Sequence, residues 1–296
     1  MPRPPRSSIA FPVWLGAVAV ALAVAWVGVA MASGSERIVS LNPSLTAILV
    51  ALGAEESLVG VDDYSAAKIP EVTALPQVGG LFSPSLEAVV ALRPDRVVLV
   101  PSAEQRDFRT RLEGLGVPVT AFKNLHFAEV LENIRQLGAM TGRSAEATAR
   151  IEAITQAREA ARRRARGRNA PGVLVVLQRD PVYVVGSGNF IDEMLSAVGG
   201  KNLASEFDEP YPRVAAEWVV ARAPEVLIDL SPDPSSALAH WSNWPSIPAV
   251  AHGRVLAVDA ELISLPGPHL DRAFELLAAG LYPAGPAKNS PPESGR

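Results

Sequence analysis

Apolar side chains recur along residues 144–167 at the spacing of one helix face. The stripe consists of Ala147, Ile151, Ile154, Ala157, Ala161 and Ala165. Steps of three and four residues place all of them on one side of an α-helix. Ser144 suits the start of this helix, and Gly167 and Pro171 suit its end. About 23 residues would span roughly 35 Å, so the segment is either an ordinary packed helix or a strut that joins two lobes.

Short apolar runs alternate with helical patterns on both sides of this segment. The predicted strands are residues 37–41, 58–61, 96–100, 117–122, 173–177, 182–185, 226–230 and 255–258. Such alternation is typical of mostly parallel sheets that helices cover on both faces. We therefore expect an α/β protein in which two Rossmann-like lobes with mostly parallel sheets are joined by one long rigid helix.

Two stretches of the chain repeat one pattern. Residues 85–100 read SLEAVVALRPDRVVLV, and residues 215–230 read AAEWVVARAPEVLIDL. The matching pairs are Glu87 with Glu217, Pro94 with Pro224, and Asp95 with Glu225. A generic helix–proline–strand unit, or chance, would also give this pattern. Because the unit occurs once on each side of the long helix, it favours two similar lobes that face one another.

The N-terminal residues have the features of an export signal. Arg3 and Arg6 precede an apolar run at residues 9–30, and Ala30-Met31-Ala32 fits the small-x-small rule for cleavage after Ala32. The run is also long enough to remain as an N-terminal membrane anchor. Both alternatives place the rest of the chain outside the cytoplasmic membrane, and cleavage would release it into the periplasm.

The expected organisation is therefore a series of five segments. They are a signal peptide at 1–32, an N-terminal α/β lobe at 33–143, a connecting helix at 144–168, a C-terminal α/β lobe at 169–284 and a disordered tail at 285–296. The tail is assigned from its glycine, proline, serine and charged residues, which cannot build a packed core.

Composition excludes several classes of protein. The chain has no cysteine, so it has no disulfide, thiolate metal site, cysteine nucleophile or lipid-modified N-terminal cysteine. Removing residues 1–32, whose charged side chains are Arg3 and Arg6, changes the formal net charge from −4 to −6. An acidic chain is a poor candidate for binding nucleic acid.

Motifs for catalysis and for a metal receptor are missing from the sequence. The sequence contains no GxSxG, Walker or GxGxxG motif, so we do not expect an enzyme. A zinc or manganese receptor would need three or four histidine and carboxylate ligands that converge. The four histidines, His126, His240, His252 and His269, are scattered along the chain. We therefore expect no metal site built from protein ligands.

Seven motifs resemble one family of transport proteins. They are RIVSLNPSLTAIL, VGVDDY, SLEAVVALRPDRVV, GSGNFIDEMLSAVGGKNL, YPRVAAEWVVARAPEVLI, WPSIPAVAHGRVLAVD and PGPHLDRAFELLA, and together they extend over about residues 36–283. The chain resembles the substrate-binding proteins of ABC importers with a helical backbone, which take up cobalamin, ferric siderophores and haem. The resemblance implies two lobes joined by a long helix, with the ligand in the cleft between them. It also implies a monomer that delivers its ligand to a permease dimer and its ATPase.

Ligand contacts are expected from loops at the carboxyl ends of the strands. The candidates are Asn42, Ser44, Tyr64, Leu81, Phe82, Ser102, Tyr211, Glu261 and His269. In the resembling family, Tyr64 matches an aromatic residue of the cleft and Tyr211 matches a tryptophan. Aromatic rings suit a flat, largely apolar macrocycle. The tryptophan that cobalamin binders carry near Gly79 is absent here. Each tyrosine has the alternative of a partly buried loop residue.

His269 occupies a position where relatives often have arginine. Its side chain could contact the ligand, bind the metal of a chelate, or simply start a helix. Without an arginine here, an anionic siderophore is less well matched, and Asp62, Asp63, Asp259 and Glu261 also favour a neutral or cationic ligand. We expect cobalamin or a related corrinoid, with a ferric siderophore or haem as the alternative, and no cofactor besides that ligand.

Glu87 and Glu217 lie at the same place in the two repeated stretches. An unpaired buried carboxylate is costly, so we expect both side chains to face solvent. The simple interpretation is that each complements a helix dipole. The resemblance implies instead that this pair docks onto arginines of a two-fold symmetric permease, with one contact from each lobe.

Overall fold

The computed structural model describes residues 35–101 and 106–283. The signal segment with its cleavage site, Ser102 and the predicted tail lie outside the described residues. The described part of the chain from Glu36 onwards forms one compact unit. None of its described helices is long and apolar enough to cross a membrane.

The N-terminal lobe is built on a parallel sheet with the strand order β2-β1-β5-β6. Its strands are β1 (Ile38–Ser40), β2 (Leu58–Val61), β5 (Arg96–Leu99) and β6 (Val119–Ala121). A small hairpin pairs β3 (Gly79–Gly80) with β4 (Ser83–Pro84). The helices are α2 (Pro43–Ala51), α3 (Asp63–Lys68), α4 (Leu86–Ala91) and α5 (Arg106–Gly114), with short 3-10 turns at Glu55–Ser57 and Pro70–Val72. The parallel sheet predicted for this lobe is confirmed.

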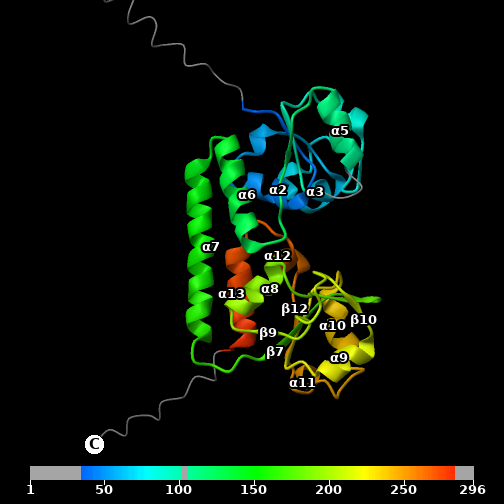
Figure 1. The fold of residues 1–296 in the computed structure, drawn as a ribbon, viewed down its shortest axis with the longest axis vertical. Coiled ribbons are helices and arrows are strands. Elements are labelled where there is room, and N and C mark those ends of the chain that lie inside the picture. Colours follow the sequence, from blue (N-terminus) through cyan, green and yellow to red (C-terminus); the bar gives the residue numbers. More distant parts are fainter. Residues whose placement is uncertain (1–34, 102–105, 284–296) are drawn as a thin grey trace, which may run out of the picture. The chain divides into compact units, whose positions relative to one another are not determined.

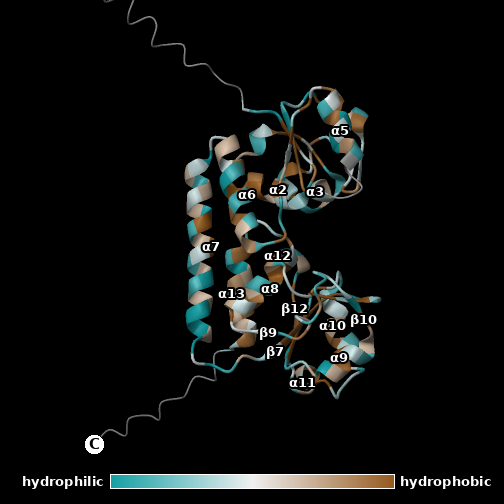
Figure 2. Cartoon of the chain, viewed as in Figure 1, coloured by the Kyte–Doolittle hydropathy of each residue, from teal (hydrophilic) through white to brown (hydrophobic). Residues whose placement is uncertain are grey.

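The long helix is present as α7 (Ser144–Ala165), which follows α6 (Phe127–Met140). It packs against α6 on the N-terminal side and against α13 (Leu270–Leu281) on the C-terminal side (Figure 1). Its apolar stripe faces the core: Ala147, Ile154 and Ala161 are buried, and Ile151, Ala157 and Ala165 pack against the same cluster. In Figure 2 the hydrophilic positions of α7 stand out in its lower turns, which lead to the C-terminal lobe. The interpretation as a strut is therefore confirmed.

The start of α7 differs from the expectation. Ser144 is the first helical residue, and Arg143 holds the cap position without a side-chain cap bond. The end agrees, since Gly167 adopts the left-handed backbone with φ +74° that glycine tolerates best.

The C-terminal lobe is built on a mixed sheet with the order β10-β8-β7-β11-β12. Its strands are β7 (Gly172–Arg179), β8 (Val182–Val184), β9 (Lys201–Asn202), β10 (Arg213–Val214), β11 (Val226–Asp229) and β12 (Val255–Ala257). The pairs β7–β8 and β8–β10 are antiparallel, whereas β7 pairs with β9 and β11 in parallel, as does β11 with β12. The helices besides α13 are α8 (Phe190–Ala197), α9 (Ala216–Arg222), α10 (Ala237–Trp241), α11 (Pro248–Ala251) and α12 (Ala260–Ser264), with a 3-10 turn at Pro234–Ser236.

Of the short helices that were not expected from the sequence, α3 and α12 bear on the site. We expected a loop after β2, at Asp62, Asp63 and Tyr64. The structure instead has helix α3 there, and Asp62 caps it by accepting a hydrogen bond from the Ser65 amide (2.9 Å). In the C-terminal lobe, Asp259 caps α12 by accepting from the Glu261 amide (3.0 Å). Both helices are too short for a visible hydrophobic period, and both carry residues of the candidate site.

The repeated stretches have the same backbone geometry. The acidic residue after each proline binds the start of the neighbouring strand: Asp95 Oδ2 accepts from the Arg37 amide, and Glu225 Oε1 accepts from the Gly172 amide, both at 2.9 Å. The residue before each proline has a left-handed backbone, with φ 48° at Arg93 and 47° at Ala223. The internal repeat is therefore present in the structure as well as in the sequence.

Candidate functional site

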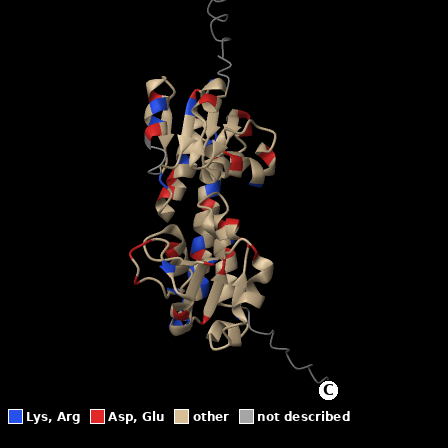
Figure 3. Ribbon diagram, turned by 90° about the vertical axis from the view of Figure 1, so that its right-hand side faces the viewer, with Lys and Arg blue, Asp and Glu red and all other residues tan. Residues whose placement is uncertain are grey.

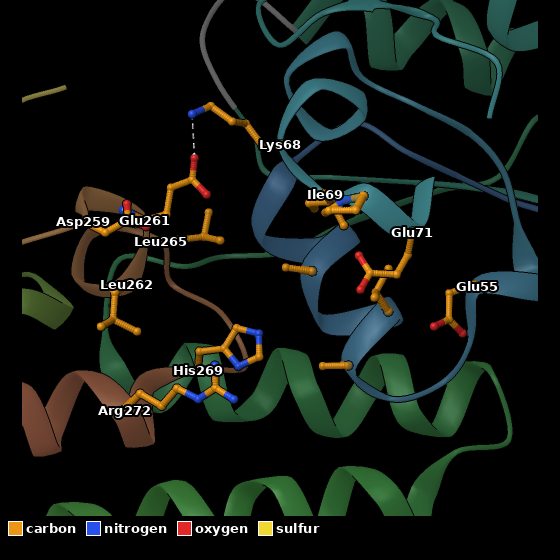
Figure 4. A pocket seen from close by; sticks show the side chains of 14 residues that line it. Glu55, Lys68, Ile69, Glu71, Asp259, Glu261, Leu262, Leu265, His269 and Arg272 are labelled. Atoms are coloured by element: carbon orange, nitrogen blue, oxygen red, sulfur yellow. Dashed lines mark hydrogen bonds and ion pairs between the residues drawn. The ribbon is translucent and has the colours of Figure 1, made fainter. Parts of the chain in front are cut away.

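A cavity of about 490 Å³ lies between the two lobes (Figure 4). The N-terminal lobe contributes Ala47, Val50, Ala51, Glu55, Lys68, Ile69, Pro70 and Glu71. The C-terminal lobe contributes Asp259, Glu261, Leu262, Leu265, His269 and Arg272. The cavity is therefore lined by apolar side chains from α2 and α12 and by charged side chains from both lobes. This mixture is usual for a small-molecule site.

One ion pair connects the lobes at this cavity. Lys68 Nζ on α3 lies 3.0 Å from Glu261 Oε1 on α12 (Figure 4). The Tyr64 hydroxyl donates to the same Oε1 atom at 3.5 Å, and Lys68 Nζ lies 5.9 Å from the centroid of the Tyr64 ring. The fold thus brings together two of the predicted site residues, Tyr64 and Glu261, across 197 positions of sequence.

These contacts also raise two pKa values. The hydrogen bond and the negative charge of Glu261 raise the pKa of Lys68. Burial raises the pKa of the Tyr64 phenol, and the Glu261 charge adds to this effect. At neutral pH the site therefore presents an ammonium group and a protonated phenol to one carboxylate.

A buried polar network holds α3 in place. Asp62 is fully buried, and the Ser65 hydroxyl donates to Asp62 Oδ2 at 2.5 Å. Ser65 Oγ lies 3.1 Å from Thr46 Oγ1, whose hydroxyl donates to Ser40 Oγ at 2.8 Å. Burial raises the pKa of Asp62 despite these hydrogen bonds. The network ties the ends of β1 and β2 to α3, and so fixes the helix that carries Tyr64 and Lys68.

His269 stands at the start of α13 and lines the cavity. Its ring makes no cap bond, and burial, with the nearby Arg272 and Arg150 charges, lowers its pKa. The imidazole is therefore neutral at neutral pH, when it can both donate and accept a hydrogen bond. In the part of the chain that the structure describes, no group of three or more histidine, aspartate or glutamate side chains is arranged to hold a metal ion.

The cavity carries charges of both signs. Its carboxylates are Glu55, Glu71, Asp259 and Glu261, and its cations are Lys68 and Arg272. Figure 3 shows acidic and basic positions on the segments where the two lobes meet. The expectation of an acidic surrounding is therefore met only in part. The lack of an arginine at position 269 does not leave the cavity without a guanidinium group, because Arg272 supplies one from the next turn of α13.

Of the predicted site residues that the structure describes, Glu261 and His269 line this cavity, whereas Tyr64, Leu81 and the others do not. Asn42 and Ser44 are buried, and Asn42 Oδ1 caps α2 by accepting from the Ser44 amide (3.0 Å). Phe82 (65% exposed) sits in the hairpin between β3 and β4, and Tyr211 (41% exposed) in the loop before β10. Whether any of them contacts a ligand stays a prediction.

Sequence reasoning missed Lys68 and Arg272. Each follows a predicted site residue by three or four positions, namely Tyr64 and His269, and so shares a helix face with it. The signal was therefore present for Arg272, which follows His269 by three residues in the motif PGPHLDRAFELLA. It was hidden for Lys68, because α3 itself was not recognised.

Comparisons with known proteins agree with this architecture. Residues 38–262 match the family model described as periplasmic binding protein. An uncharacterized ABC transporter substrate-binding lipoprotein of Bacillus subtilis, YvrC, is 28% identical over 84% of this chain and 80% of its own length. A cobalamin-binding protein of Halobacterium salinarum is 30% identical over 84% of this chain and 70% of its own length.

A solved structure shares the fold. The periplasmic heme-binding protein RhuT from Roseiflexus sp. RS-1, in its apo form, superposes with a TM-score of 0.73 and is 28% identical, with coverage of 84% of this chain and 98% of that chain. The predicted fold class is therefore confirmed. Proteins of this family carry substrates outside the cytoplasm and do not transform them, which confirms the expectation of a binding protein rather than an enzyme. The chain belongs to the periplasmic binding protein family.

Proposed function

We propose that this protein is the extracytoplasmic substrate-binding component of an ABC importer, and that it captures cobalamin or a related corrinoid between its lobes. The observation that carries the proposal is the inter-lobe cavity, with Tyr64 and Glu261 brought together at its edge. The similarity to a cobalamin-binding protein over most of the chain supports the choice of ligand.

The side chains at hand suit a corrinoid chemically. Tyr64 and Tyr211 are both partly exposed, and Phe82 is largely exposed, and aromatic rings suit the face of a flat macrocycle. Glu261 and the neutral His269 can hydrogen-bond the primary amides at the edge of a corrin ring. The remaining predicted contacts, Asn42, Ser44 and Ser102, would act from the ends of the N-terminal strands. The metal chelate is the cargo, and we propose no resident cofactor.

Haem or a ferric siderophore is the second candidate. The similarity to a solved haem-binding protein and the neutral His269 ring support haem, because a neutral imidazole can bind iron. Arg272 would suit a carboxylate of either ligand.

Thermal melting distinguishes these ligands. At a free ligand concentration of about 100 times Kd, binding stabilises the folded state by about 2.7 kcal/mol. We expect cyanocobalamin to raise the Tm clearly, and haemin and a ferric hydroxamate siderophore to raise it little. A shift with haemin or the siderophore alone would replace the corrinoid proposal by the second candidate.

Glu87 and Glu217 are the proposed docking residues for the permease dimer. Both are exposed in the first turn of their helices, α4 and α9, as expected. Because the two units have the same backbone geometry, each lobe of a monomer could make one equivalent contact with a two-fold symmetric permease. The permease would in turn work with its ATPase. Carboxylates in such positions can pair with arginine in a bidentate, orienting way.

A double variant tests the docking proposal. Glu87→Ala with Glu217→Ala should weaken binding to the permease by roughly tenfold or more, because charge pairs at an interface orient and hold the partner. Ligand affinity should stay the same. The matched control removes two exposed carboxylates from α7, Glu152→Ala with Glu159→Ala. Normal transport by the Glu87/Glu217 variant, or loss of ligand binding, would show that the pair does not act in docking.

We further propose export to the periplasm with cleavage after Ala32. The charged start, apolar run and Ala30-Met31-Ala32 support it. N-terminal sequencing of the native protein should begin at Ser33. An intact Met1 on membrane-bound protein would favour the retained anchor instead.

A further inference from the structure

The ion pair between Lys68 and Glu261 is a direct bridge between the lobes at the edge of the cavity. Lys68 lies at the end of α3 in the N-terminal lobe, and Glu261 lies in the first turn of α12 in the C-terminal lobe. The two side chains are 51% and 35% exposed. They reach one another from opposite walls in Figure 4. The bridge is therefore accessible to solvent and to an arriving ligand.

Both residues of this bridge lie on helices whose N-termini are capped by an aspartate side chain. The buried Asp62 caps α3, and Asp259 caps α12. Tyr64 and Lys68 are one helical turn apart, and both address Glu261 Oε1, at 3.5 and 3.0 Å. The distance from Tyr64 and Lys68 to Glu261 consequently depends on the distance between the lobes. We call these three side chains, Tyr64, Lys68 and Glu261, the inter-lobe latch.

The latch occupies groups that a ligand would use. The Lys68 ammonium holds the Glu261 carboxylate, a group that accepts hydrogen bonds strongly and could accept from a ligand's amide N–H. It also lies near the Tyr64 ring, 5.9 Å from its centroid. A ligand that stacks on Tyr64 or donates to Glu261 therefore competes with Lys68.

We propose that Lys68 is a specificity-determining residue, which closes the latch in the free protein and is displaced from Glu261 by a ligand that carries primary amides. This inference rests on the proposed corrinoid function and deepens it. A small cation cannot readily bind Glu261, because Lys68 already neutralises this carboxylate. A ligand with several amide donors makes enough contacts to replace the ion pair.

Replacing Lys68 tests the proposal through affinity. Because solvent-exposed ion pairs contribute little, Lys68→Met should tighten cyanocobalamin binding by only about two- to fivefold. Wild-type affinity should rise when salt increases from about 0.05 M to about 0.5 M, since salt screens the latch, and the affinity of the variant should not. Lys123→Met, an equal change at an exposed site outside the cavity, is the matched control and should behave like the wild type.

A charge swap supplies the rescue. Lys68→Glu with Glu261→Lys rebuilds the bridge with opposite polarity and serves a ligand-free distance measurement, because lysine at position 261 cannot accept the amide N–H that Glu261 accepts. Weaker cyanocobalamin binding by Lys68→Met would show that Lys68 contacts the ligand instead, and would overturn the latch. An unchanged affinity at every salt concentration would overturn it as well.

A second measurement needs no ligand. The chain has no cysteine, so spin labels can be placed at Leu115→Cys and Leu238→Cys, two exposed positions in opposite lobes. Lys68→Met should broaden the distance distribution of the free protein, and the charge swap should restore it. If cyanocobalamin fails to bind but the distances change in this way, the corrinoid proposal is wrong and the latch stands. If the distances do not change, the latch is wrong whichever ligand binds.

Discussion

The two repeated units, residues 85–100 and 215–230, share a backbone path but differ at one buried position. In both, a proline follows a left-handed residue, and an acidic side chain accepts from a backbone amide at the start of the neighbouring strand at 2.9 Å. Val89 and Val219 are fully buried at matching places. The few residues that the units have in common are therefore those that set the path of the chain.

The units differ most at the last residue of their strands. Leu99 ends β5 among apolar neighbours of the N-terminal lobe. Its counterpart Asp229 ends β11 fully buried, where Oδ2 accepts from Arg179 Nε (3.0 Å) and Trp241 Nε1 (2.6 Å). One backbone frame thus tolerates an apolar core position in one lobe and an ion pair in the other. The difference shows that the repeat conserves geometry rather than packing.

The largest predicted effect comes from breaking this buried pair. Asp229→Ala should cost about 3–5 kcal/mol in the free energy of unfolding, because it leaves the Arg179 guanidinium, 12% exposed, without the carboxylate that balances its charge. Urea unfolding measures the loss. Adding Arg179→Met should recover part of it, since the uncompensated charge is then removed. A loss below about 1 kcal/mol for the single variant would mean that the pair is not buried as described.

A smaller effect should come from the helix caps, where only one unit has a capping side chain. Ser85 Oγ accepts from the Ala88 amide (3.2 Å), whereas Ala215 has no side-chain cap. Ser85→Ala should destabilise the protein by about 1 kcal/mol, and Ala215→Ser should stabilise it by a similar or smaller amount. Denaturant melts of both variants check the pair, and changes of equal sign would contradict the cap assignment.

The smallest effect concerns the left-handed residues that the units share. Arg93→Gly and Ala223→Gly should each stabilise the protein by about 0.5 kcal/mol, because relief of the left-handed strain slightly exceeds the entropy that glycine adds to the unfolded chain. Thermal melts should show the same sign for both variants. Opposite signs would mean that the two backbones are not equivalent.

Long or repeated patterns predicted most of the fold. The stripe from Ala147 to Ala165 located α7, and the repeat predicted the exposed positions of Glu87 and Glu217. The helices α3 and α12 were missed because five or six residues are too few to show a period. The contact of Lys68 with Glu261 could not be predicted, since it depends on how the two lobes meet and not on any local pattern. For the same reason the site residues could be predicted one by one, but not which of them contact one another.

The central claim is that a corrinoid binds between the lobes against Tyr64 and Tyr211. Calorimetric titration of cyanocobalamin into the wild type, Tyr64→Ala and Tyr211→Ala tests it directly, with the exposed Leu115→Ala as control. We predict one cyanocobalamin per chain, an affinity loss of about tenfold for each tyrosine variant, because each loses an aromatic contact worth roughly 1–1.5 kcal/mol, and no change for the control. Wild-type affinity that survives in both tyrosine variants, or no heat with the wild type, would contradict the account.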